Sequence, residues 1–232
     1  LRWQRVVPAQ FPGCKARYLK HGTPLDAGSG CTWEEAKAYC SRPELAMQLG
    51  GGTWRLPTKI EAESIIDVSR IPAVDPLFDM EPSDPGDPGW EISHVWTISP
   101  TPNPNGLKLA WAIDYSEGYS YASARYGAGR VRCVSSASAT GGGAPDYAAT
   151  DNVVTDWNTR LRWQAVTDSQ TRTWQEAIQY CETLKLDEGR WRLPTLKELL
   201  SIVDARRLSP AAETKLFAFR DGGRGFWTST SY

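Results

Sequence analysis

The pentapeptide Trp-Arg-Leu-Pro-Thr occurs twice in this chain, at residues 54–58 and again at residues 191–195. Three further motifs surround each copy in the same order: Leu-Arg-Trp-Gln at residues 1–4 and 161–164, Trp-x-Glu-Ala-x-x-Tyr-Cys at residues 33–40 and 174–181, and Trp-Thr at residues 96–97 and 227–228. Ordered self-similarity of this kind indicates two copies of one domain. We therefore expect a tandem repeat.

The repeat sets the predicted domain boundaries. The first domain is expected over residues 1–134 and the second over residues 146–232, joined by a flexible Ser/Ala/Gly-rich linker over residues 135–145. The first copy continues for more than thirty residues beyond its Trp-Thr, whereas the second stops four residues beyond Thr228. We expect the second domain to be C-terminally incomplete and the chain to be a piece of a longer protein.

The composition limits the classes of function. Of the 232 residues, 41% are hydrophobic, which suffices for packed cores, and eleven Trp against two Met favour rigid aromatic packing. The net charge of −1 indicates no partner bound through bulk charge, so neither nucleic acid nor an anionic membrane surface is expected. No apolar run approaches the roughly 18 residues that a membrane span requires.

Four helix starts are predicted by capping boxes, in which a Thr side chain accepts from the amide of a Glu three residues later and that Glu reaches back. The pairs are Thr32 with Glu35, Thr58 with Glu61, Thr173 with Glu176, and Thr195 with Glu198. Apolar residues at helical spacing follow the first and third boxes, and we expect both stripes to be buried. They are Trp33, Ala36 and Cys40 in the first copy, and Trp174, Ala177, Ile178, Cys181 and Leu184 in the second.

Strands and irregular segments are predicted between the helices. Alternation and composition favour strands over residues 1–7, 94–99, 109–115 and 129–134. Glycine, proline and charge favour irregular structure over residues 11–30, 71–89 and 220–225, the last as a turn before a strand that holds Phe226 and Trp227.

Arg55 and Arg192 occupy the same position in the two pentapeptides. One interpretation makes each an anion or carboxylate clamp for a ligand. The other makes each a brace for a neighbouring carboxylate, such as Asp67 or Asp204, or for a loop carbonyl. We favour the brace, because Arg suits planar buried pairing and both copies carry it.

The segment of residues 114–126 is rich in Tyr, Ser and Gly. One interpretation is a binding loop, because Tyr supplies a large contact area at low entropic cost while Ser and Gly adapt to a ligand. The other is a strand whose alternating Tyr side chains pack on a sheet, and the sequence leaves both open. If the segment binds, the expected ligand face consists of Trp111, Asp114, Tyr115, Glu117, Tyr119, Tyr121 and Arg125.

The five cysteines are Cys14, Cys31, Cys40, Cys133 and Cys181. Free thiols in a reducing cytosol are one interpretation, and disulfides in an exported protein are the other. No Cys-x-x-Cys spacing points to a metal, and an incomplete second domain accounts for the odd count. We therefore expect disulfides and export.

The ordered motifs, together with the closing Arg-Cys-Val at residues 132–134, resemble the Legionella collagen-like protein C-terminal domain family over nearly the whole chain. The resemblance implies an α+β fold of two tandem C-type-lectin-like domains, related to the formylglycine-generating enzyme superfamily. Each domain would hold two short helices packed on a small antiparallel sheet. It also implies paired terminal strands and a helix-to-last-strand disulfide. Cys40 with Cys133 fits that disulfide, Cys14 with Cys31 would form an extra bridge, and Cys181 would pair with a residue outside this segment.

Two departures from the related folds shape the expected chemistry. The Glu-Pro-Asn or Gln-Pro-Asp triplet and the Trp-Asn-Asp of calcium-dependent lectins are absent, so no metal ligand set is expected and binding would be calcium-independent. The cysteine pair that holds copper in the oxidase branch is also absent. His21 and His94 are the only histidines, and we expect both to be solvated. No catalytic residue and no cofactor is predicted.

Three functions follow in order of preference. The first is a non-enzymatic binding or adhesion module, exported to the bacterial cell surface or envelope, with a glycan or another surface ligand as its partner. The second is a structural subunit or decoration of an extracellular fibre or envelope assembly, acting as a homo-oligomer. An enzyme is third, because no nucleophile or cofactor site can be named.

Overall fold

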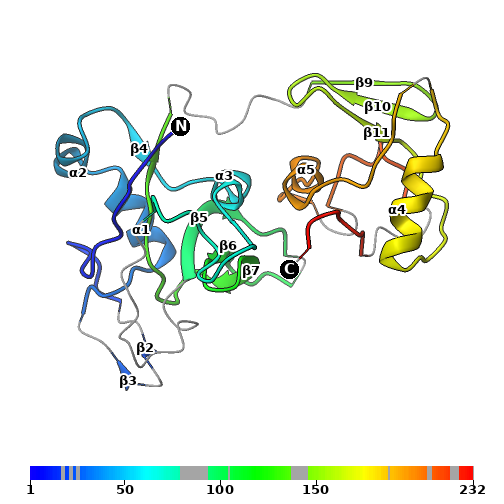
Figure 1. Cartoon of the computed structure of the whole chain (residues 1–232). Coiled ribbons are helices and arrows are strands. Elements are labelled where there is room, and N and C mark those ends of the chain that lie inside the picture. Colours follow the sequence, from blue (N-terminus) through cyan, green and yellow to red (C-terminus); the bar gives the residue numbers. More distant parts are fainter. Residues whose placement is uncertain are drawn as a thin grey trace. The chain divides into compact units, whose positions relative to one another are not determined.

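The computed structural model is an α+β structure of short helices and small antiparallel sheets (Figure 1). It divides into two compact units, Leu1–Gly141 (unit 1) and Gly142–Tyr232 (unit 2). The structure describes residues 1–16, 19–20, 23–24, 27–78, 94–103, 105–136, 146–187, 189–207, 211–219 and 225–231. The predicted linker lies outside these residues except for Ser135 and Ser136, and so does His21.

Unit 1 combines three short helices with two three-stranded sheets in its described part. The helices are α1 (Trp33–Cys40), α2 (Pro43–Gln48) and α3 (Lys59–Ser64). One sheet has the order β1-β8-β4, formed by β1 (Arg2–Trp3), β8 (Val134–Ser135) and β4 (Trp54–Arg55). The other has the order β5-β6-β7, formed by β5 (His94–Pro100), β6 (Leu109–Asp114) and β7 (Tyr119–Ala124). A hairpin pairs β2 (Leu19–Lys20) with β3 (Thr23–Pro24).

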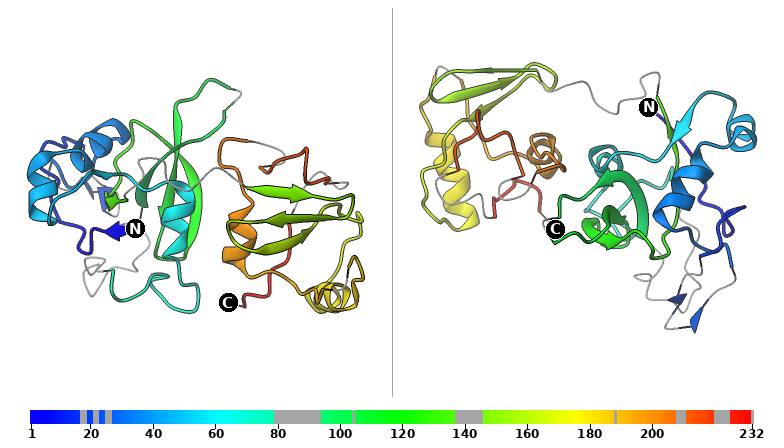
Figure 2. Two further views of the ribbon diagram at one scale, coloured as in Figure 1. Left: turned by 90° about the horizontal axis from the view of Figure 1, so that it is seen from above. Right: turned by 180° about the vertical axis from the view of Figure 1, so that it is seen from behind.

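Unit 2 places two helices beside one described sheet. The helices are α4 (Trp174–Thr183) and α5 (Leu196–Ser201). The sheet has the order β11-β10-β9, formed by β11 (Leu161–Gln164), β10 (Val153–Asp156) and β9 (Tyr147–Ala149). Figure 2 shows this sheet beside α5.

Several predicted strands change their bounds. The strands at 94–99 and 109–115 are confirmed as β5 and β6, and the strand at 1–7 shortens to β1. The segment 129–134 is not one strand, because its residues pair with different segments. Gly129 forms an isolated bridge with Cys31, Arg130 forms another with Val95, and only Val134 belongs to β8. Phe226 and Trp227 lie outside any strand, and most of the turn predicted before them lies outside the described residues. Ser135, placed in the linker by composition, pairs with Arg2 in the β1-β8 ladder.

All four capping boxes are confirmed. At α3, the Glu61 amide donates to Thr58 Oγ1 at 3.2 Å, and the Thr58 amide donates to the Glu61 carboxylate at 2.8 Å. The preceding proline disfavours helix for its own predecessor, so the helix cannot begin earlier. The Trp-Arg-Leu-Pro-Thr stretch is therefore a sharp entry into a capped helix, made twice.

Arg55 and Arg192 each brace a neighbouring carboxylate, as predicted, but the suggested partners Asp67 and Asp204 are wrong. Arg55 donates to both carboxylate oxygens of Glu61 at 2.7 and 2.8 Å. Arg192 repeats this with Glu198 at 2.8 and 2.5 Å. Each guanidinium also donates to a neighbouring loop carbonyl. The capping box turns its Glu back toward the helix start, and this brings the carboxylate beside the arginine.

The Arg192–Glu198 pair predicts a pH-dependent stability of unit 2. Hydrogen bonds from Arg192 lower the pKa of Glu198 to about 2 from 4.5, although burial opposes them. A lowered folded pKa stabilises the fold above pH 4.5, and this contribution is lost as the pH falls toward 2. Because Arg192 is mostly exposed, we expect no more than about 1 kcal/mol.

The measurement compares the free energy of unfolding of the native chain with that of Glu198→Gln in urea, from pH 7 to pH 2. Gln retains the capping geometry but cannot ionise. The native protein should be more stable at pH 7, and the difference should shrink as the pH falls below 4.5. Glu182→Gln, at an exposed position of α4, is the control. A difference that stays constant over this range would contradict the assignment.

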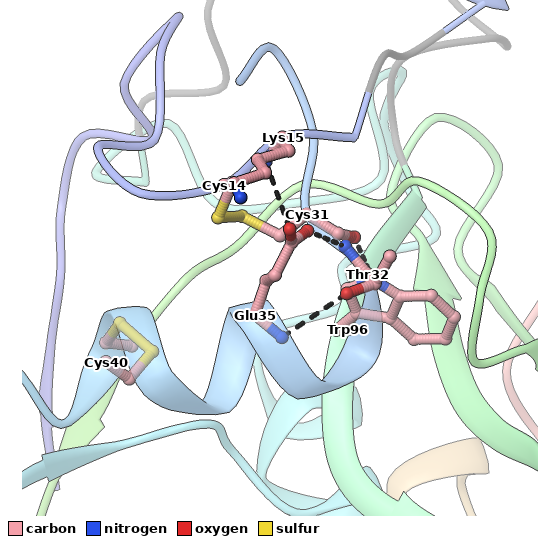
Figure 3. Close-up of a disulfide and its surroundings, with 8 residues drawn as sticks. Cys14, Lys15, Cys31, Thr32, Glu35, Cys40 and Trp96 are labelled. Atoms are coloured by element: carbon pink, nitrogen blue, oxygen red, sulfur yellow. Dashed lines mark hydrogen bonds between the residues drawn. A yellow bond between two sulfur atoms is a disulfide. The ribbon is translucent and has the colours of Figure 1, made fainter. Parts of the chain in front are cut away.

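The core of unit 1 holds two disulfides, and both implied pairings are confirmed. Cys14 bonds Cys31, and Cys40 bonds Cys133. Figure 3 shows how the first disulfide connects to α1: the Lys15 amide donates to Glu35 at 3.1 Å, and this glutamate caps the helix. Hydrogen bonds and burial act oppositely on Glu35: burial raises its pKa, but the bonds prevail and lower it.

Four hydrogen bonds recur at equivalent places in the two units. The indole of Trp33 donates to Thr97 O at 2.7 Å, and the indole of Trp174 donates to Thr228 O at 2.8 Å. The indoles of Trp96 and Trp227 donate to Cys31 O and Arg172 O, respectively. The amides of Ile98 and Ser229 donate to Pro57 O and Pro194 O. The amides of Lys59 and Leu196 donate to Ser99 Oγ and Thr230 Oγ1. The units are therefore built on the same internal scaffold.

The predicted helix stripes differ in burial between the units. Trp33, Ala36 and Cys40 are buried as expected. In α4 only Ala177 is buried, whereas Trp174, Ile178, Cys181 and Leu184 are partly exposed. The physical reason is that the described part of unit 2 has no counterpart of β6, β7 or β8, so the strands that cover this scaffold in unit 1 are missing there.

Candidate functional site

Part of the Tyr-rich segment forms a strand, β7 (Tyr119–Ala124), whereas residues 115–118 form the turn before it. β7 pairs with β6 in register, with Tyr119 opposite Asp114 and Tyr121 opposite Ala112. β6 pairs in turn with β5, where His94 is opposite Asp114. Because side chains alternate between the faces of a strand and paired residues share a face, the register assigns each predicted site residue to one side of the sheet.

The predicted ligand face divides between two faces of this sheet. One face carries His94, Trp96, Asp114, Tyr119 and Tyr121. The opposite face carries Trp111, Ile113, Ser120 and Ala122 and is covered by α3 at one end (Figure 2). A single ligand cannot contact both faces, so Trp111 does not belong with the tyrosines.

An aromatic ladder runs across the first face; we define it as Tyr119, Tyr121, His94 and Trp96. The ring centroids of Tyr119 and Tyr121 are 5.7 Å apart, those of Tyr121 and His94 are 5.2 Å apart, and those of His94 and Trp96 are 4.6 Å apart. The Tyr121 hydroxyl lies 2.6 Å from His94 Nδ1. Exposure falls along the ladder, from 47% at Tyr119 to 0% at Trp96. The outer ring is therefore supported by a row of tilted and edge-on ring contacts.

His94 is not the solvated histidine that the sequence suggested. Its ring packs between Tyr121 and Trp96, and its Nε2 atom is buried without a hydrogen-bond partner. Burial lowers the pKa of His94 to about 4, against the opposing charge of Asp114. The imidazole is consequently neutral at physiological pH. The sequence missed it because its role depends on the pairing of β5 with β6.

Carboxylates surround the outer tyrosine. Asp114 is buried and accepts from the Ser116 amide at 2.8 Å and from the Ser116 hydroxyl at 2.5 Å. Glu117 is exposed in the turn between β6 and β7. Burial, followed by the charges of Asp114 and Glu117, raises the pKa of Tyr119. The site therefore presents an aromatic ring with oxygen acceptors at its border.

Tyr115 is a core residue, which corrects its assignment to the ligand face. Its side chain is fully buried, and its hydroxyl donates to Ala62 O at 2.8 Å. Burial raises the pKa of Tyr115 above its usual range. The side chain packs in the cluster that joins α3 to the sheet, where it contacts no solvent.

The two remaining predicted residues have structural contacts. The Lys59 ammonium lies 4.9 Å from the centroid of the Trp111 ring. Lys59 also forms a buried ion pair with Glu63. Arg125 stacks on Trp33 with its guanidinium 4.2 Å from the ring centroid, and its Nε donates to Leu109 O at 2.9 Å. The structure thus brings together Asp114, Glu117, Tyr119 and Tyr121, and it adds His94 and Trp96 behind them.

Two further features are absent from the described part of the chain. No helix there is both long and apolar enough to cross a membrane. No group of three or more His, Cys, Asp or Glu side chains there is placed to hold a metal ion.

The fold and the site define a class: a tandem repeat of small α+β units in which unit 1 is crosslinked by two disulfides and presents an aromatic ladder on a sheet face. The chain belongs to the Lcl C-terminal domain family, which matches residues 1–135 and 152–232. The match covers both units and confirms two copies, the second being shorter. No curated protein and no solved structure matches the chain.

Proposed function

We propose that this protein is an exported, non-enzymatic binding or adhesion module with a lectin-like fold, and that unit 1 binds its ligand at the aromatic ladder. The family assignment and the two disulfides support this proposal, because disulfides persist in oxidising compartments outside the cytosol. The exposed carboxylate of Glu117 lies at the border of this surface, and the buried carboxylate of Asp114 adds negative charge behind it.

The observation that carries the proposal is the exposed ring of Tyr119 on a fixed support. A Tyr side chain that is 47% exposed usually moves freely, but this one contacts the ring of Tyr121 at a tilt, and the Tyr121 hydroxyl is in turn hydrogen-bonded to His94. A ring held in place loses little conformational entropy when a ligand covers it. Rigid aromatic side chains with low ordering cost are typical anchors of binding surfaces.

The border of the ring indicates the ligand chemistry. Glu117 is exposed next to Tyr119 and offers carboxylate oxygens, which accept hydrogen bonds. A sugar ring has an apolar face that can cover Tyr119 and hydroxyl groups that can donate to these oxygens. We therefore infer that the ligand is a neutral glycan rather than an anionic one, because the carboxylates would repel negative charge.

Tyr119→Ala tests the proposal. Binding of the intact chain to a panel of immobilised neutral glycans should fall about 30-fold, since removal of an interface anchor typically costs about 2 kcal/mol. The melting temperature should remain nearly unchanged, because Tyr119 is exposed. Tyr126→Ala is the matched control: its ring is 85% exposed and lies outside the ladder.

Equal retention by the two variants would contradict a ligand site at the ladder. If Tyr119→Ala instead abolished self-association in size-exclusion chromatography and left glycan binding intact, a structural subunit of a surface assembly would be the better function. Replacement of Tyr121 is unsuitable for this test, because its side chain packs against the main core cluster and its loss would also destabilise the fold.

A further inference from the structure

The strand β7 forms one edge of the β5-β6-β7 sheet in unit 1. Among the described residues its only strand neighbour is β6. The strand at the opposite edge, β5, is partly covered, because Val95 forms a bridge with Arg130. The side of β7 that faces away from β6 is therefore an open edge in the described part of the unit.

Alternate backbone groups of β7 point to this open edge. The Arg125 amide, directly after the strand, donates to Lys108 O at 3.0 Å and so points to the β6 side. Successive amides of a strand point to opposite edges. The amides that alternate with that of Arg125, namely those of Ser120, Ala122 and Ala124, consequently point outward. The edge offers these donors, and the carbonyls of the same residues, to another strand.

β7 lacks the features that normally protect an edge strand. Exposed edges are usually short, or they carry charged residues, proline or a bulge. The edge strands of the other sheet, β1 and β4, are each two residues long, whereas β7 has six residues. Its sequence, Tyr-Ser-Tyr-Ala-Ser-Ala, holds no charge and no proline, and it pairs with β6 through six consecutive residues without a bulge. The edge is therefore suited to strand addition.

The side chains of β7 leave room for a second backbone. Ser120, Ala122 and Ala124 are small, and Ala122 is exposed. The larger side chain of Tyr121 leans away from the open edge, because its hydroxyl lies 2.6 Å from Nδ1 of His94 on β5, beyond β6. Another strand can thus approach to the usual spacing of about 4.8 Å.

The two ends of β7 are complementary in charge. Glu117 lies in the turn before the strand and is exposed, whereas Arg125 follows the strand and is half-buried. Each lies four residues from Tyr121, in opposite directions. A second β7 that pairs antiparallel, with Tyr121 on the two-fold axis, would bring each Glu117 opposite Arg125 of the other copy. The same register places Ser120 opposite Ala122 of the other copy, so the paired amides are those that point outward.

We propose that β7 is a dimer interface, through which two copies of unit 1 pair antiparallel about a two-fold axis at Tyr121 and form one continuous sheet. Two-fold contacts of this kind use the same surface on both copies and close without further growth. Strand addition satisfies the backbone groups of an exposed edge. Because paired residues share a face, both aromatic ladders would lie on the same side of the joined sheet. This inference goes beyond the proposed binding function and does not depend on it.

Sedimentation velocity of the intact chain measures the dimer at concentrations up to the millimolar range. Every sample carries Cys181→Ser, which prevents crosslinking through the free thiol. We expect monomers when the protein is dilute and dimers when it is concentrated, because one pair of strands buries less area than a permanent dimer requires. Hydrogen exchange by NMR should slow at the Ser120 and Ala122 amides in the concentrated sample only.

Ala122→Pro tests the edge. It removes an outward amide, and proline is tolerated on an edge strand where the amide faces solvent, so the pairing with β6 should persist. Each dimer loses two equivalent hydrogen bonds, and the association constant should fall about 30-fold. Ala122 is opposite Trp111, on the face that does not carry the aromatic ladder, so the substitution leaves the ligand surface intact.

Glu117→Arg tests the register. The new arginine would lie opposite Arg125 of the other copy, and the association constant should fall about tenfold. Added salt should weaken the native dimer but strengthen the Glu117→Arg dimer, because it screens an attraction in the first and a repulsion in the second. Glu44→Arg, at an exposed position of α2, makes the same change of charge away from the edge and is the matched control.

Four outcomes would overturn the proposal. The first is a chain that stays monomeric over the whole concentration range. The second is a dimer that Ala122→Pro does not weaken, which would use another surface. The third is slow exchange at Ser120 and Ala122 that does not depend on concentration, which would show that the edge is covered within its own chain. The fourth is an equal effect of Glu117→Arg and Glu44→Arg. If Ala122→Pro lowers the melting temperature, Glu117→Arg and its control decide.

Discussion

Replacing Cys40 and Cys133 together by Ala should destabilise unit 1 by about 4–5 kcal/mol, because the disulfide closes a loop with a sequence separation of 93 residues. Crosslinking so long a segment removes much of the conformational freedom of the unfolded chain. The disulfide also connects the end of α1 to the segment that leads into β8, so it crosslinks the first half of unit 1 to its last strand. This is close to the entire stability of a typical small domain.

The other disulfide provides the comparison. Cys14 and Cys31 are separated by only 17 residues, so their joint replacement by Ala should cost about 3 kcal/mol. Hydrogen exchange of β5 and β6 amides at increasing urea concentrations reports on unit 1 within the intact chain. If the double variant at Cys40 and Cys133 does not fold, selective reduction of the native protein gives the same ranking. An equal or reversed order of the two losses would contradict this prediction.

Tyr115→Ala should destabilise unit 1 by about 3–5 kcal/mol, as expected when a large aromatic side chain is removed from a core. The side chain is fully buried in the cluster that joins α3 to the sheet, and its hydroxyl donates to Ala62 O. Tyr115→Phe retains the ring and should cost only about 1 kcal/mol, the typical net value of one hydrogen bond.

Urea denaturation of the intact chain, followed by exchange of α3 and β6 amides, measures these losses. Tyr119→Ala is the matched control: the same substitution, four residues away, should change stability by less than about 0.5 kcal/mol because its ring is exposed. Similar losses for Tyr115 and Tyr119 would contradict the division of the predicted ligand face into core and surface.

Local features of the fold could be predicted because their causes are local. A capping box needs only a Thr and a Glu three residues apart, so the starts of four of the five described helices were visible in the sequence. The start of α2 was not predicted, because its N-cap residue Arg42 forms no side-chain cap hydrogen bond. The tandem repeat was likewise visible, because equivalent motifs occur in the same order. The brace role of Arg55 followed from its duplication, but its partner did not. Asp67 appeared as plausible as Glu61 until the capping geometry placed Glu61 beside the guanidinium.

The candidate site could be predicted only in part, because it depends on strand register. The Tyr-rich segment was visible, yet Trp111 and Tyr121 were grouped although the pairing of β6 with β7 puts them on opposite faces. Tyr115 and Tyr119 have the same side chain. Tyr115 is buried because it packs in the cluster that joins α3 to the sheet, whereas Tyr119 lies outside this cluster and is exposed. His94 belongs to the site because β5 pairs with β6, which places His94 opposite Asp114 although the two residues are separated in the sequence.

By itself, the sequence determined the repeat, the starts of four of the five described helices and the membership of the chain in its family, because these depend on neighbouring residues and on motif order. The tertiary structure alone decided which tyrosine is available to a ligand, where His94 lies, and which side chains share a face of the β5-β6-β7 sheet. These features arise from contacts between segments tens of residues apart. Because a shift of one residue in register moves every side chain to the other face, no local pattern can specify them.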